Sequence, residues 1–292
     1  MCAGKRYRGN HMQNSLARER NLVSLLVHIG LAAGFIYAAF PVIWMAAMSF
    51  RLNPEIFTAP PRLIPKQPTI AAYNEIILNP LRLRYFVNSY IVAFSVTFLT
   101  VAVALLAAYS LSRFNYPGKK VIHMFIISTQ TVPPITLLIP YFGMIVAFRL
   151  YNTYFALVFT YMALTLPYAV LMMTGYFNTI PRELDEAVLV DGGSRFYALR
   201  KVLVPVSVPG IVATSIYTFL LAWNEFLFAL TLTKTNEMRT VPVGILQMMG
   251  EHSYEWNQMM AISILGSIPI LVIYLFAQKQ FMAGMTAGSV KA

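Results

Sequence analysis

Long apolar stretches alternate with short polar connections along almost the whole chain. Six of them approach the length of about 20 residues that a helix needs to cross a bilayer. They cover residues 22–49, 87–111, 121–147, 154–177, 211–232 and 259–278. These stretches are too long and too continuous for the alternating strands of a membrane barrel. Because only helices and closed barrels satisfy their own backbone in hydrocarbon, the pattern predicts an all-α membrane protein with six transmembrane helices.

The composition supports a lipid environment. Of the 292 residues, 58% are hydrophobic and 11% are charged, and the mean hydropathy is +0.62. In a soluble domain about a quarter of the residues are charged. Lipid is therefore the expected solvent for most of this chain.

Basic residues before the first apolar stretch predict the orientation. They are Lys5, Arg6, Arg8, Arg18 and Arg20. By the positive-inside rule they place the N-terminus in the cytoplasm, and six crossings return the C-terminus to the same side. The predicted parts are a basic cytoplasmic tail (1–21), a transmembrane domain (22–280) with a cytoplasmic loop (178–204), and a cytoplasmic C-terminal tail (281–292).

Charge and cysteine content exclude several classes of function. The net charge is +11, but the basic residues are scattered over loops without the interleaved aromatic residues of RNA-binding sheets, so no nucleic-acid partner is expected. The single cysteine, Cys2, excludes an internal disulfide. The four histidines lack metal-ligand spacing, and no metal site is predicted.

Prolines interrupt the third apolar stretch. Pro133, Pro134 and Pro140 remove backbone donors and are expected to bend or break the helix. Such breaks are tolerated at membrane depth only against protein or a water-lined cavity. A kink that serves packing and a role in a gate are both consistent with this pattern.

The loop over 178–204 has a helical pattern. Pro181 suits a first helical turn, and three carboxylates follow near the positive end of the helix dipole. Leu184, Ala187 and Val188 form a narrow apolar stripe. A glycine pair beginning at Gly192 ends this helix, and the following serine can cap a second one. The stripe could pack on the membrane surface or contact a partner.

This loop resembles a known signature. The segment "EAVLVDGGSRFYALRKVLVP" resembles the cytoplasmic loop of permease subunits of binding-protein-dependent ABC importers, which reads Glu-Ala-Ala, three residues, Gly, nine residues, Ile-x-Leu-Pro. The matching positions are Glu186, Ala187, Gly192 and Pro205, and the departures Val188, Val202 and Val204 are all apolar. Relatives commonly carry Ala at Gly193. The stretches "LAWNEFLFALTL", "TVPVG" and "FMAGMTAGSVKA" are similar to the second permease of maltose-type carbohydrate importers.

The resemblance implies the type I permease fold of ABC importers and a place in the bacterial cytoplasmic (inner) membrane. It implies that the 183–200 segment docks on a separate ATPase, with the coupling residues Leu184, Glu186, Ala187, Val188, Asp191 and Gly192. The implied partners are a second homologous permease, two copies of an ATP-binding subunit, an extracytoplasmic solute-binding protein and membrane lipid. The C-terminal tail is expected to reach between the two ATPases, although its small residues would also suit a frayed end.

The chain is expected to be a transport subunit rather than an enzyme. It has no G-x-x-x-x-G-K-[ST] phosphate loop, so ATP and Mg are expected in the partner ATPase and no cofactor in this chain. The implied cargo is a carbohydrate or a polyol-like solute. The alternatives are a stand-alone ion-coupled transporter and an intramembrane enzyme. The adjacent carboxylates Asp185 and Glu186 point about 100° apart on a helix, which is poor geometry for shared catalysis.

The fifth apolar stretch carries candidate pathway residues. Glu225 is the only acidic residue within a predicted span, and a charge at mid-bilayer costs roughly 2.5–3.5 kcal/mol on insertion scales. It is therefore expected to face a cavity, a partner or water. Trp223 and Asn224 offer a stacking face and an amide for sugar rings and hydroxyls, or contacts that serve helix packing.

Overall fold

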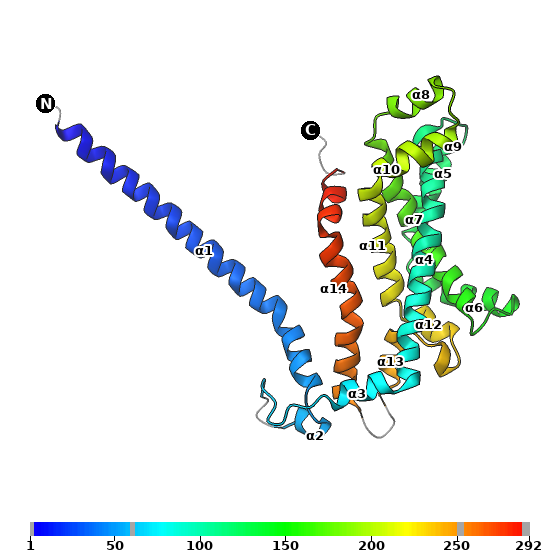
Figure 1. The fold of residues 1–292 in the computed structure, drawn as a ribbon, viewed down its shortest axis with the longest axis horizontal. Coiled ribbons are helices and arrows are strands. Elements are labelled where there is room, and N and C mark those ends of the chain that lie inside the picture. Colours follow the sequence, from blue (N-terminus) through cyan, green and yellow to red (C-terminus); the bar gives the residue numbers. More distant parts are fainter. Residues whose placement is uncertain (1–2, 59–61, 250–253, 288–292) are drawn as a thin grey trace.

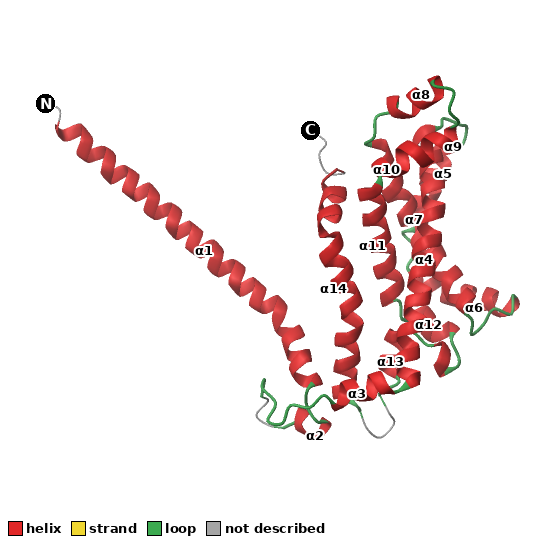
Figure 2. Cartoon of the chain, viewed as in Figure 1, coloured by secondary structure: helices red, strands yellow, loops and turns green. Residues whose placement is uncertain are grey.

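The computed structural model describes residues 3–58, 62–249 and 254–287, with side chains described for 21, 23–58, 62–249, 254–276 and 278. In this part of the chain helices are joined by loops, and the only β-type pairing is an isolated bridge between Met249 and Tyr254 (Figure 2). The predicted all-α membrane fold is confirmed. Residues 288–292 of the predicted C-terminal tail lie outside the described residues.

In the described part of the chain, four continuous helices are long and apolar enough to cross a membrane. They are or include α1 (Ala3–Ser49), α4 (Pro80–Arg113), α7 (Tyr154–Asn178) and α14 (Trp256–Ala287). Two further pairs of helical segments each meet at a sharp bend, and counting each pair as one span gives six spans. In the first, α5 (Lys119–Thr129) meets η1 (Pro134–Leu137) and α6 (Leu138–Ala147) at 97°. In the second, the segment of α9 (Arg195–Ala198), η2 (Leu199–Leu203) and α10 (Val204–Val206) meets α11 (Val208–Asn224) at 78°.

Helices α4 and α7 form the centre of the bundle. Small residues line their contact and are fully buried: Ala93, Ala104 and Ala108 on α4, and Ala156 and Ala169 on α7. The hydroxyls of Thr100 and Thr165 lie 3.1 Å apart across the same contact. Between helices in lipid, small residues and hydroxyl pairs allow close approach where the hydrophobic effect gives no driving force. Helix α11 packs beside this pair, and α14 packs against α11 (Figure 1).

Helix α1 leans away from the rest of the molecule (Figure 1). Its apolar stretch from Val23 onward has almost no buried residue until Met48, where the helix contacts the base of α14. Its apolar face is therefore open to lipid or to another subunit.

The two ends of the bundle carry different elements (Figure 1). One end holds α8 (Glu183–Val190) together with α9, the start of α1 and the end of α14. The other holds α2 (Asn53–Ile56), α3 (Ala71–Leu78), α12 (Leu227–Leu232), η3 (Asn236–Met238) and α13 (Val241–Leu246). The fully buried Asn88 fixes this second end, because its amide donates to the carbonyls of Glu237 and Arg239 at 2.7 and 2.8 Å and accepts from the Tyr154 hydroxyl at 2.7 Å.

The prediction of one continuous helix over 211–232 is wrong. Helix α11 ends at Asn224, and α12 begins at Leu227. At Glu225 the backbone is extended, with φ −68° and ψ 127°. The third predicted span does break at Pro133 and Pro134 as expected, whereas Pro140 lies in the first turn of α6, where no backbone donor is needed.

Gly244 in α13 gives a test of the packing at this end. A Cβ at this position would overlap the ring of Tyr85, which is itself buried. We expect Gly244→Ala to lower stability by about 1–3 kcal/mol through overpacking. Heating the detergent-solubilised protein and following its size-exclusion peak measures this. Gly143→Ala is the control, because a Cβ at position 143 would meet no atom within 4 Å; equal midpoints for the two variants would contradict the expected overpacking.

Candidate functional site

The break between α5 and η1 (the first break) and the break between α11 and α12 (the second break) both lie at one cavity. This cavity has a volume of about 950 Å³. Gln130 and Pro134 line it from the first break, and Asn224, Glu225 and Phe226 line it from the second. Side chains of α7 and α11 complete its wall. A space of this size lies at the upper end of the range for small-molecule sites.

Glu225 belongs to this cavity and also holds the second break in place. One carboxylate oxygen accepts the backbone N–H of Phe228 at 2.8 Å, and the other accepts that of Ala229 at 2.9 Å. These are two of the N–H groups that the first turn of α12 leaves unpaired. The charge therefore lies at the positive end of α12, which offsets the cost of its position within the membrane.

Uncharged hydrogen-bonding groups make up the rest of the polar lining. The most enclosed is Tyr161 on α7, which is 1% exposed and lies beside Glu225. Tyr141, Tyr217 and Gln130 add further polar atoms. Among the described lining residues none is Lys, Arg or His, so Glu225 is the single charged side chain.

The predicted pathway residues do not all meet here. Asn224 and Glu225 line the cavity, but Trp223 does not. Trp223 is buried in the core, with its ring 5.5 Å from Phe219 and 4.9 Å from Tyr90 between centroids, and its Nε1 donates to the carbonyl of Gly266 at 3.1 Å.

Sequence reasoning missed Tyr161, Tyr217 and Gln130. The two tyrosines carry no local signal, because the chain has 17 tyrosines spread along its length. Gln130 was detectable as a polar residue inside an apolar stretch and shortly before the Pro133–Pro134 pair.

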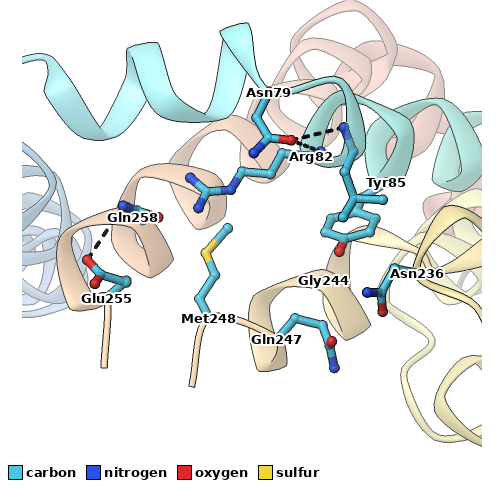
Figure 3. Close-up of a pocket in the computed structure, with 10 residues that line it drawn as sticks. Asn79, Arg82, Tyr85, Asn236, Gly244, Gln247, Met248, Glu255 and Gln258 are labelled. Atoms are coloured by element: carbon cyan, nitrogen blue, oxygen red, sulfur yellow. Dashed lines mark hydrogen bonds between the residues drawn. The ribbon is translucent and has the colours of Figure 1, made fainter. Parts of the chain in front are cut away.

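A second, smaller pocket lies at the end of the molecule opposite α8 (Figure 3). Its volume is about 320 Å³. Arg82, Glu255 and Gln258 contribute polar atoms to it, and Tyr85 packs over Gly244 on its wall. Both signs of charge are present, which distinguishes this pocket from the cavity at the helix breaks.

The loop between α7 and α11 forms another candidate site, at the end of the molecule that carries α8. The predicted pair of short helices is present as α8 and α9, and Ser194 caps α9 by accepting the N–H of Tyr197 at 3.1 Å. Gly192 has a φ of +79°. The Gly192 N–H reaches the Leu189 carbonyl at 3.1 Å and the Gly193 N–H reaches the Val188 carbonyl at 2.8 Å, which is the Schellman arrangement at a helix C-terminus.

Most of the predicted coupling residues lie on the outer face of α8. Glu186, Ala187, Asp191 and Gly192 are exposed, and Leu184 is 40% exposed. Val188 is half-buried and lies on the same side of α8 as the buried Asp185. Val190, which the sequence pattern did not single out, is 86% exposed.

Comparison with known proteins places this architecture. The chain is 37% identical to the permease protein MalG of the trehalose/maltose transport system of Thermococcus litoralis, over 94% of this chain and 99% of the relative. It is 38% identical to the permease protein SmoH of the sulfoquinovosyl glycerol transport system of Agrobacterium fabrum, over 86% of this chain and 88% of the relative. A crystal structure of a bacterial ABC transporter that imports the acidic polysaccharide alginate has the same fold, with a TM-score of 0.78 at 20% identity over 90% of this chain and 98% of that chain.

The family model of the inner membrane component of binding-protein-dependent transport systems matches residues 80–286. This range contains both helix breaks, the cavity and the loop with α8 and α9. The chain therefore belongs to this family of multi-pass inner-membrane permeases, which are transport components of ABC importers and not enzymes.

Proposed function

We propose that this chain is the transmembrane subunit of an ATP-driven importer for an uncharged saccharide. The observation that carries the proposal is the cavity at the two helix breaks, with its aromatic rings and its uncharged hydrogen-bonding groups. Tyrosine rings offer apolar faces and polar tips to a sugar, and the amides of Gln130 and Asn224 can both donate and accept. A relative named for trehalose and maltose transport supports this class of cargo.

The charge distribution favours a neutral cargo over an anionic one. The described lining offers no cation, and the positive end of α12 is already occupied by the Glu225 carboxylate. Half-helix N-termini are where transporters commonly bind anionic groups. A sulfonated or uronic substrate would meet a negative charge here instead.

The exposed loop at the opposite end is proposed to dock on the ATPase. Its outer face presents Leu184, Ala187 and Val190 between the acidic residues of α8. In this proposal Glu186, Val188, Asp191 and Gly192 complete the coupling segment, and ATP and Mg bind the ATPase. Because the N-terminal part of α1 carries the basic sequence segment and lies at the same end as α8, the positive-inside rule assigns this end to the cytoplasm (Figure 1). The proposed assembly has a second permease, two ATP-binding subunits and an extracytoplasmic binding protein.

The geometry at Glu225 argues against a stand-alone ion-coupled transporter. Proton relays within the membrane use chains of ionisable groups, whereas Glu225 is the single charged side chain of the described lining. Both oxygens of Glu225 accept backbone N–H groups. Energy from a separate ATPase fits the family of this chain better.

Reconstitution tests the proposed function directly. In proteoliposomes that contain this chain, its second permease, its ATPase and its binding protein, we expect ATP-dependent uptake of labelled maltose or trehalose. Uptake of a sulfonated glycoside should be weaker, because the lining lacks a cation. Sugar uptake by this chain alone, without the ATPase, would overturn the importer assignment, and preferred uptake of the anionic glycoside would overturn the assignment of a neutral cargo.

The role of Glu225 can be measured by Glu225→Gln. The amide keeps one acceptor but turns an N–H donor toward a backbone N–H, so we expect a loss of about 0.5–2 kcal/mol, as for other helix caps, together with reduced uptake. The matched control is Glu237→Gln, which removes an exposed carboxylate from η3. Thermal midpoints in detergent and initial uptake rates report the two effects. If both variants match the wild type, Glu225 neither caps α12 nor shapes the cavity.

The turn at Gly192 provides a test of docking. Gly192→Ala forces a side chain into the left-handed region, at a cost of roughly 1–2 kcal/mol, and should displace the end of α8 and weaken ATPase binding. Gly118→Ala imposes the same strain, with a φ of +84°, in a turn at the same end that is not part of the docking surface. Co-purification of the ATPase should fall only for Gly192→Ala. An equal yield of bound ATPase for both variants speaks against docking through α8.

A further inference from the structure

One side chain connects the end of α4 to the loop that carries α8. Arg113 is the last residue of α4, and its Nε donates to the carboxylate of Asp185 in α8. Its Nη1 donates to the carbonyl of Phe177 at 3.0 Å, and its Nη2 donates to the carbonyl of Ile180 at 3.1 Å. Both carbonyls belong to the end of α7 and the residues just after it. The guanidinium therefore joins α4, α7 and α8 at one point.

This ion pair is enclosed by the protein. The Arg113 side chain is 5% exposed and that of Asp185 is 10% exposed, whereas the other carboxylates of α8 point to solvent. In the only other Lys/Arg–carboxylate pair within 4 Å among the described side chains, Arg82 with Glu75, the carboxylate side chain is 52% exposed. Loss of one partner from an enclosed pair leaves the other charge buried and uncompensated.

Neighbouring contacts also connect the end of α4 to this loop. Arg182, just before α8, donates to the carbonyl of Ser112 at 3.0 Å. The hydroxyl of Tyr109 donates to the carbonyl of Arg195 at 3.2 Å, and the Arg195 guanidinium lies 4.8 Å from the centre of the Phe114 ring. The end of α4 thus contacts both short helices of the loop.

We infer that Arg113 and Asp185 make α8 move as one body with α4 and α7. A displacement of α8 by the ATPase then reaches the two helices at the centre of the bundle. Helix α7 carries Tyr161 and Thr165 into the wall of the cavity, and Thr165 contacts Thr100 of α4. Arg113 and Asp185 are accordingly positioning residues that link nucleotide-driven motion to the pathway. This inference rests on the proposed docking of α8 on the ATPase.

Removal of either charge should uncouple the complex without releasing the ATPase. In the reconstituted complex, Arg113→Gln and Asp185→Asn should leave the amount of bound ATPase unchanged, because the outer face of α8 is intact. The sugar transported per ATP hydrolysed should fall roughly fivefold or more, the lower range of coupling between distant sites. Lys120→Gln, which removes an exposed cation at the same end, is the matched control and should keep the wild-type ratio.

A cross-link tests whether the contact between Arg113 and Asp185 transmits the movement of α8 or only stabilises the fold. In a Cys2→Ser background, Arg113→Cys with Asp185→Cys should be uncoupled when reduced and should recover coupling when a short thiol cross-linker joins the two positions. Recovery is expected only if α8 moves rigidly with α4. Loss of transport on cross-linking would overturn the inference that α8 moves with α4 and α7. A wild-type ratio of sugar transported to ATP hydrolysed in Arg113→Gln and Asp185→Asn would overturn it as well. Full ATPase binding by Gly192→Ala would instead overturn the docking proposal.

Discussion

In hydrocarbon an unpaired backbone N–H or C=O costs several kcal/mol, and this chain breaks its helices at the cavity between α5 and η1 and between α11 and α12. Each break is stabilised by side chains close to it. At the first, the hydroxyls of Thr129, Thr131 and Thr136 donate to backbone carbonyls three residues earlier, at 2.7 Å in each case. At the second, Glu225 accepts the N–H groups of α12. The irregular backbone at these two breaks therefore lies at the wall of the cavity.

The same requirement shapes the end that carries α8. The carbonyls at the end of α7 need donors, and Arg113 supplies two while its third contact holds Asp185. A group that completes one helix therefore also fixes the position of another. With the alanine-lined contact between α4 and α7, this leaves few independent degrees of freedom between the outer face of α8 and the cavity wall.

The fold does not decide the cargo. A transporter of an acidic polysaccharide shares this architecture at 20% identity, and a relative named for a sulfonated glycoside is as similar in sequence as one named for trehalose and maltose. Under the proposed function, selectivity then depends on a few lining positions rather than on the fold. In this chain those positions are uncharged except for a carboxylate that is already bound to backbone.

The sequence by itself determined whatever depends on near neighbours in the chain. Apolar run length predicted the membrane helices, Pro133 and Pro134 predicted the first break, and the glycine at 192 predicted the turn after α8. Only the tertiary structure decided which distant groups meet. Arg113 and Asp185 are 72 residues apart, and Tyr161 reaches the cavity from a different helix than Glu225. The sequence predicted both Trp223 and Glu225 as pathway residues in one apolar stretch, but the chain turns between them, so Trp223 packs in the core and Glu225 lines the cavity. The conformational preferences of neighbouring residues set the backbone conformation, whereas the direction in which a side chain points depends on how whole helices pack.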